Sequence, residues 1–305
     1  MTGGSALVRR ATLAAALALA MVPALALAAE DAEKFKPDQE FKLEPYISIP
    51  KIGPIDLSIN KAVIYMLMSS VIAIVGSILV IRGGLKMRPT KGQNVVEMVY
   101  EFAETNIARS TLPKKVFSQW FPYIASLFVF ILVNNLISFI PLPFGHEKGG
   151  LGISWLPDLG LYAATANLSV TLALTIVTFV VSHHVGIRQN GARGYWKSLK
   201  PHGVPKKKIG EKFLYGMVYV LELFGQLLRL ISLSVRLFAN MMAGHMLIIM
   251  AAGFAALVGS LVGAVAVPFG VFFYFFEWVL VAGLQAFIFA MLSGIYIGFA
   301  AEAPH

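Results

Sequence analysis

Residues 222–245 read Glu-Leu-Phe-Gly-Gln-Leu-Leu-Arg-Leu-Ile-Ser-Leu-Ser-Val-Arg-Leu-Phe-Ala-Asn-Met-Met-Ala-Gly-His. This stretch is apolar, yet it carries one acid, two arginines, an amide and a histidine. From Phe213 to Ala300 the sequence has one further charged residue, Glu277. A charge at mid-bilayer costs about 2.5 to 3.5 kcal/mol on insertion scales, so such residues mark ion or substrate pathways. The stretch therefore points to a membrane protein with polar groups built into its last spans.

The polar residues of this stretch recur at helical spacing. Glu222, Arg229 and Arg236 are seven residues apart, which is about two helical turns, so they lie near one face. Asn240 extends that face by one more turn. His245 comes nine residues after Arg236 and points in roughly the opposite direction if the helix is regular.

An alternative interpretation is that these charges are ion pairs that hold helices together. Glu222 with Arg229 fits that interpretation as well as it fits a functional one. Arg236 fits it less well, because no acid of the same helix is left to pair with it. Its candidate partners are Glu277, on another helix, or a carboxylate on another protein.

The composition of the whole chain agrees with a membrane protein. Of its 305 residues, 57% are hydrophobic and 13% are charged, against about 25% charged in soluble domains. The chain has no cysteine, which excludes disulfides, thiolate metal sites and cysteine nucleophiles. A net charge of +9 could indicate nucleic acid as a partner. The basic residues lie in loops beside apolar spans, however, so membrane topology explains them better and no nucleic-acid partner is expected.

The N-terminus has the pattern of a signal peptide. Arg9 and Arg10 precede an apolar run over residues 11–27, and small residues at Ala26 and Ala28 form a cleavage pattern. We expect a signal peptide at 1–28, an exported segment at 29–60 and a membrane domain at 61–305. The alternative is an uncleaved first span.

Five apolar spans follow, at roughly 62–82, 117–142, 161–186, 213–258 and 264–300. A bilayer core needs about 20 helical residues, and the first three spans fit that length. The last two are too long, since about 45 helical residues would reach roughly 67 Å; they must be steeply inclined or broken. We predict an all-α integral membrane protein with five transmembrane helices, the last two forming a long inclined hairpin that turns at 262–268.

Positive charge orients these spans. The connections 82–116 and 187–212 are rich in lysine and arginine, whereas 143–160 carries only Lys148. The positive-inside rule places the first two in the cytoplasm, the N-terminus outside and the C-terminus inside. Within the first connection, residues 94–107 form an amphipathic cytoplasmic helix, which we expect on the membrane surface or against partner helices. A solvated surface helix is the alternative.

Small residues and small polar groups mark positions where helices meet. Asn134, Asn135, Thr165 and Asn167 are expected to hydrogen-bond neighbouring helices, or alternatively to line a hydrated path from outside. In the last span, small residues recur every four positions, which allows another helix to approach closely; we expect that helix to be the preceding long span. The stripe consists of Ala282, Ala286, Ala290, Gly294 and Gly298.

Residues 231–245 resemble subunit a of F-type ATP synthases, through Arg-Leu-Phe-Ala-Asn followed by Ala-Gly. Residues 284–289 (Leu-Gln-Ala-Phe-Ile-Phe), 167–171 and 135–141 support the resemblance, which covers about 60–300. It implies a stator whose two inclined helices lie against a ring of c subunits, each with a mid-membrane carboxylate reached by two aqueous half-channels. The other implied partners are peripheral stalk b subunits, the ATPase catalytic head through the complex, and the lipid bilayer.

The resemblance also assigns roles to residues. Arg236 is implied to be the essential arginine between the half-channels. Asn240 corresponds to the asparagine one turn further on, Gln285 to the glutamine of the last helix, and Glu222 to an acidic position before the arginine. Together with His245 and Glu277 these residues form the expected proton-translocation set. No catalytic residue, metal ion or cofactor is expected.

The sequence departs from part of this pattern. Some bacterial members carry a glutamate nine residues after the arginine and a histidine in the last helix, whereas His245 and Glu277 follow the mitochondrial-type arrangement. One acid and one imidazole are kept, so a proton relay is still expected. Glu277 precedes Gln285 by eight residues, where the family pattern has seven, which indicates either a local bulge or an offset partner. Ser138 and Asn167 stand where some bacterial relatives have aspartate.

The resulting prediction is a non-catalytic, proton-conducting stator subunit in a bacterial plasma membrane. The alternative is an independent secondary transporter or cation channel, although the sequence shows no convincing internal repeat. An intramembrane enzyme is disfavoured, because no phosphate-binding loop, dinucleotide fingerprint, metal motif or nucleophile elbow occurs in a credible context.

Overall fold

The structure is a computed structural model and describes residues 45–47, 58–83, 89–140, 162–198, 209–257 and 260–302. The expected signal peptide at 1–28 and most of the exported segment lie outside these residues. Within them the protein is almost entirely helical. A two-stranded antiparallel ladder joins β1 (Pro45–Ile47) to β2 (Ile59–Asn60), directly before the first long helix.

Among the described residues, five helical stretches are long and apolar enough to cross a membrane, as predicted. Asn60 caps the first of them by accepting a hydrogen bond from the Val63 amide at 3.2 Å. The helical elements are α3 (Lys61–Arg82), α4 (Lys91–Phe102), η2 (Ala103–Ala108), α5 (Arg109–Thr111), α6 (Lys114–Ile137), η3 (Ala164–Ala166), α7 (Leu168–Ser198), α8 (Ile209–Leu257), α9 (Ser260–Phe275), η4 (Phe276–Val281) and α10 (Ala282–Ala301).

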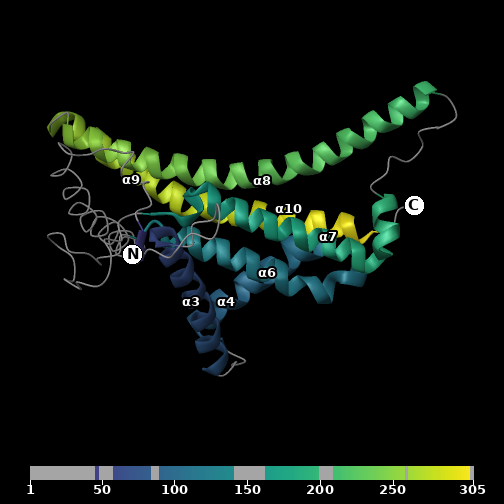
Figure 1. Cartoon of the computed structure of the whole chain (residues 1–305). Helices are drawn as coiled ribbons and strands as arrows, with labels where there is room; N and C mark the ends of the chain where they lie inside the picture. The colour runs from purple at the N-terminus through teal and green to yellow at the C-terminus, as the bar shows by residue number, and fades with distance from the viewer. Residues whose placement is uncertain are drawn as a thin grey trace, which may run out of the picture.

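The long helices run in two directions (Figure 1). Helices α6, α7, α8 and α10 lie alongside one another, whereas α3 crosses them at a steep angle. Helix α3 has 22 residues, about 33 Å, which suits one crossing close to the membrane normal. With α3 in that orientation the other four helices are all strongly inclined. The inclination predicted for the last hairpin therefore extends to α6 and α7.

The last hairpin is as long as predicted, but its turn was misplaced. Helix α8 has 49 residues, equivalent to about 74 Å, and ends at Leu257. Helix α9 begins at Ser260, so most of the predicted turn at 262–268 is helical, and Pro268 lies inside α9. Proline is tolerated within membrane helices because local adjustments and neighbouring groups satisfy the freed backbone.

A π-helical turn, η4, separates α9 from α10. Such a turn accommodates one extra residue without ending the helix. In a regular helix Glu277 and Gln285 would differ by about 80°; with the extra residue absorbed they differ by about 20°. The bulge expected from their spacing is therefore present, and it returns both side chains to one face.

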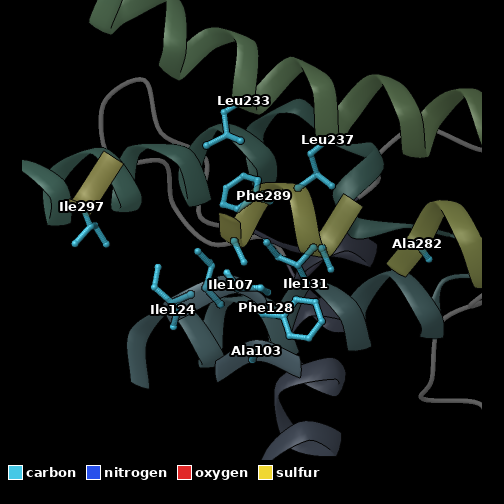
Figure 2. Packing of buried hydrophobic residues seen from close by; sticks show 14 of the residues in the cluster. Ala103, Ile107, Ile124, Phe128, Ile131, Leu233, Leu237, Ala282, Phe289 and Ile297 are labelled. Atoms are coloured by element: carbon cyan, nitrogen blue, oxygen red, sulfur yellow. The ribbon is translucent and has the colours of Figure 1, made fainter. Parts of the chain in front are cut away.

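The core is built around α10 (Figure 2). Leu233 and Leu237 of α8 point toward Phe289 of α10 from one side. On the other side Ile107 of η2 and Ile131 of α6 are fully buried. The amphipathic segment predicted at 94–107 is thus divided: α4 keeps most of its residues exposed, and η2 is packed into the core of the same chain.

The small-residue stripe of α10 is buried, but its predicted partner was wrong. A β-carbon at Gly294 would overlap the side chain of Thr111, and one at Gly298 would overlap the carbonyl oxygen of Thr111. Asn135 of α6 donates to the Ala282 carbonyl at 3.3 Å. The stripe therefore receives α5 and α6, because the bulkier face carrying Phe289 is turned toward α8.

Candidate functional site: the outer face of α8 and the Glu277 pocket

Helix α8 has one buried and one exposed face. Leu233, Leu237, Met241 and His245 recur every four residues and are buried against the bundle. Their spacing matches the helical repeat, so they form one inward stripe. Exposed residues occupy the opposite side, where α8 bows with its concave surface away from the other helices (Figure 1). The same helix therefore supports the bundle and presents a curved outer surface.

The charges singled out in the sequence lie at the edge between these two faces, because Arg229 comes four residues before Leu233 and Arg236 three residues after it. Glu222, Arg229 and Arg236 are exposed, and Asn240 is partly exposed. Within the described ranges neither arginine makes an ion pair or hydrogen bond, so the Glu222–Arg229 pair is not formed. The hydroxyl of Tyr296 on α10 is within electrostatic range of Arg229 and Arg236. Since an uncompensated cation is costly at bilayer depth, this face suits an external carboxylate.

The carboxylate of Glu277 does not lie beside Arg236. It lies against Gly244, where a β-carbon would overlap Oε2. Gly244 is eight residues after Arg236, about 12 Å further along α8. Oε2 is buried and has no hydrogen-bond partner among the described residues. Of the two partners considered for Arg236, Glu277 is therefore excluded in this arrangement.

His245 lies next to that pocket and is 3% exposed. Its Nδ1 is 3.0 Å from the Met241 carbonyl oxygen, and its Nε2 is 3.4 Å from the Ser138 carbonyl oxygen. The ring of Phe139 packs on it with centroids 4.6 Å apart. A neutral imidazole can donate from only one nitrogen, whereas an imidazolium donates from both. The two carbonyl oxygens and the Phe139 ring fix the orientation of the imidazole between α8 and the end of α6.

Two linked hydrogen bonds join η3, α6 and α10 beside this pocket. Thr165 of η3 donates to the Asn135 side-chain oxygen at 2.8 Å, and the Asn135 amide donates to the Ala282 carbonyl. Asn167 caps α7 by accepting from the Ser169 amide at 2.8 Å. The contacts of Thr165 and Asn135 match the hydrogen bonding expected for small polar residues between helices, whereas Asn167 bonds to its own helix.

Asn134 behaves differently from its neighbour. It is fully buried, and both polar atoms of its side chain have no partner among the described residues. A buried amide without a partner is unfavourable unless water reaches it. The hydrated-path alternative therefore continues to apply to Asn134.

The structure brings only part of the expected set together. It places the Glu277 carboxylate against Gly244, the residue before His245, and it leaves Glu222, Arg229 and Arg236 exposed along α8. Gln285 is 5% exposed and shares its helix face with Glu277. The sequence assigned no role to four residues near these groups, although one of them, Gly244, belongs to the Ala-Gly pair that supports the resemblance. These residues are Gly244, Tyr274, Trp278 and Tyr296.

This architecture is that of a multi-pass membrane protein with ionisable groups at bilayer depth. Residues 63–298 match the family model described as ATP synthase A chain. The chain belongs to this family.

Three relatives align along nearly their whole length. The chain is 34% identical over 279 residues to ATP synthase subunit a of Bradyrhizobium diazoefficiens, covering 89% of this chain and 100% of that one. It is 34% identical over 277 residues to the subunit of Rhodopseudomonas palustris, covering 88% and 99%. With the Rubrobacter xylanophilus subunit it shares 32% identity over 264 residues, covering 86% and 92%.

Proposed function

We propose that this protein is the proton-translocating stator subunit of the membrane sector of an F-type ATP synthase. Family membership supports this function at the level of the complex. The observation that carries it at the level of residues is Arg236, which is exposed on α8 and has no ion-pair partner within the described ranges. A cation placed in this way fits a carboxylate supplied by another subunit.

The proposed partner is a ring of c subunits. The outer wall of a ring is convex, and the outward side of α8 is concave (Figure 1). Exposed apolar side chains alone would not distinguish a partner from lipid, because both are apolar. Curvature together with Arg236 does distinguish them. The exposed apolar residues of α8 on either side of Arg236 include Met217, Phe224, Leu228, Ile231, Val235 and Met250.

Arg236 would act on the ring through charge. Arginine stays protonated at any working pH. An opposite charge within about 4 to 6 Å lowers a carboxylate pKa by about 1 to 3 units. A protonated ring carboxyl that approaches Arg236 would therefore release its proton. The same cation raises the barrier for a proton that crosses directly between the half-channels.

Glu277 and His245 would form a proton station in one half-channel. A partly buried acid against the residue before His245, whose imidazole faces two carbonyl oxygens, would hold and pass on a proton. Gln285 shares the face of Glu277, and Asn240 lies one turn from Arg236. In this proposal Asn134, whose amide lacks a protein partner in the described part of the chain, adds a hydrated position. Glu222 extends the charged face of α8.

The protein would serve a bacterial plasma membrane without a catalytic site of its own. Positive charge in the connections 82–116 and 187–212 supports a cytoplasmic C-terminus and an exported N-terminus after removal of residues 1–28. Peripheral stalk b subunits and the ATPase head would then lie on the cytoplasmic side. A mild-detergent purification separates this proposal from an independent transporter, because only a stator subunit copurifies with a c-ring and an ATPase head.

The decisive experiment is ATP-driven acidification of inverted membrane vesicles. Wild type is compared with Arg236→Ala and with Ser232→Ala, an exposed control one turn away on the same helix. At matched assembly, Arg236→Ala should abolish pumping and ATP synthesis, and Ser232→Ala should preserve both. Normal pumping by Arg236→Ala would overturn the proposal.

A further inference from the structure

The carboxyl end of α6 presents three backbone carbonyl groups to the Glu277 region. The last four carbonyl groups of a helix have no partner within the helix. At bilayer depth such groups must be satisfied by other protein groups. Here the Leu136, Ser138 and Phe139 carbonyl oxygens face three side chains from the last hairpin. Those side chains are Trp278, His245 and Tyr274, respectively.

Two of these three side chains lie on either side of Glu277. Tyr274 donates its hydroxyl hydrogen to the Phe139 carbonyl. The Trp278 indole N–H donates to the Leu136 carbonyl at 3.1 Å. Tyr274 and Trp278 are four residues apart, so both face α6. The start of η4 is thereby held against α6 by Tyr274, three residues before Glu277, and by Trp278, directly after it.

Glu277 itself makes no hydrogen bond among the described residues, and its Oε2 is nevertheless buried. Its direction must therefore come from the rotation of the helix that carries it. That rotation depends on η4, because an α-helical and a π-helical turn place the preceding residues about 100° apart. The hydrogen bonds of Tyr274 and Trp278 are the contacts in a position to select one rotation.

We propose that Tyr274 and Trp278 are positioning residues that hold the Glu277 carboxylate against Gly244, beside His245. The inference rests on the proposed function, since it concerns how the proton station is assembled. Neither residue needs to touch the proton. Their contribution is to keep the acid and the imidazole in register while the outer face of α8 works against a moving partner.

The test uses passive proton conduction by vesicles stripped of the ATPase head, measured against pH at matched assembly. The variants are Tyr274→Phe, Trp278→Phe and the double variant, which remove the donors and keep an aromatic ring at each position. Two controls make the same substitutions on α6. Tyr123→Phe breaks a 3.1 Å bond to Thr178, and Trp120→Phe removes an N–H that has no acceptor among the described residues.

The double variant should conduct about tenfold or more slowly, as expected when a reacting group is misplaced, and the pH of half-maximal conduction should shift. Both controls should keep the wild-type pH profile. A slower rate with an unchanged pH profile would show general destabilisation and overturn the inference, as would wild-type conduction. Glu277→Gln distinguishes a failure of the proposed role of Glu277 from a failure of the positioning role of Tyr274 and Trp278. If it conducts normally, the proposed role of Glu277 fails; if it is inactive while the double variant is normal, only the positioning role fails.

Discussion

The carboxylate of Glu277 occupies the space that a side chain at Gly244 would need. The contact joins η4 to α8 at the residue before His245. It also makes the absence of a side chain at this position a structural requirement of the pocket. Gly244 has an ordinary helical conformation, since Gly191 is the only positive-φ residue in the described part of the chain. The requirement is therefore one of space and not of backbone freedom.

Gly244→Ala should displace the Glu277 carboxylate and reduce proton conduction. A misplacement of about 1 Å can cost about a hundredfold in rate. Gly225→Ala, on the same helix with nothing within 4 Å of the added carbon, is the matched control and should conduct normally. Conduction is measured in vesicles at equal amounts of assembled complex. Equal rates for the two variants would contradict the assigned contact.

The approach of α5 to α10 predicts a graded response at two glycines. Gly298→Ala should destabilise the subunit by about 1 to 3 kcal/mol, the usual cost of overpacking, because the added carbon meets the Thr111 backbone. Gly294→Ala meets the Thr111 side chain instead, so Thr111→Ala should rescue it and should not rescue Gly298→Ala.

Thermal unfolding of the purified subunit in detergent measures both glycine variants. Gly283→Ala, on the same helix with open space at the added carbon, provides the control. Rescue of Gly298→Ala by Thr111→Ala would show that the backbone contact is misassigned.

The hydrogen bond between Thr165 and Asn135 should appear as a coupling energy. In membranes such bonds average about 0.6 kcal/mol in double-mutant cycles, so Asn135→Ala and Thr165→Ala should be non-additive by about that amount. Ser77→Ala on α3, whose hydroxyl bonds only within its own helix at 2.7 Å, should be additive with Asn135→Ala. Unfolding in mixed micelles measures both cycles, and additivity of the first would argue against the bond.

The outer face of α8 should be accessible only in the free subunit. The chain has no cysteine, so Ala239→Cys and Ala243→Cys each introduce a single thiol on the exposed side of this helix. A membrane-permeant maleimide should label both in the isolated subunit and label them at least about tenfold more slowly in the assembled complex, as buried sites react. Ile74→Cys on exposed α3 is the reference. Equal labelling in both states would place the partner elsewhere.

Much of the fold could be read from hydropathy and spacing. Five spans and a long last hairpin follow from apolar run length, and the common face of Glu222, Arg229 and Arg236 follows from their spacing of seven. The bulge before Gln285 was predictable because one extra residue disturbed an otherwise regular spacing. These features depend on the order of residues along one helix.

The remaining features depend on how helices shift and rotate against one another. The stripe of α10 predicts close packing, but nothing in its period distinguishes α8 from α5 and α6 as the partner. The contact of Glu277 with Gly244 needs the relative height of two helices, which single-helix periodicity does not contain. Likewise, Tyr274 and Trp278 look like ordinary aromatic residues in an apolar helix until the carboxyl end of α6 is placed beside them.

The π-helical turn η4 also has a consequence for insertions and deletions. Deleting one of residues 282–284, in the regular helix before Gln285, would turn Gln285 about 100° away from Glu277 if the π-helical turn were kept. Deleting one residue between Glu277 and Ala282 would instead let the turn relax into ordinary α-helix and leave both side chains facing the same way. This short segment can therefore gain or lose a residue over generations while the acid and the amide keep their shared orientation.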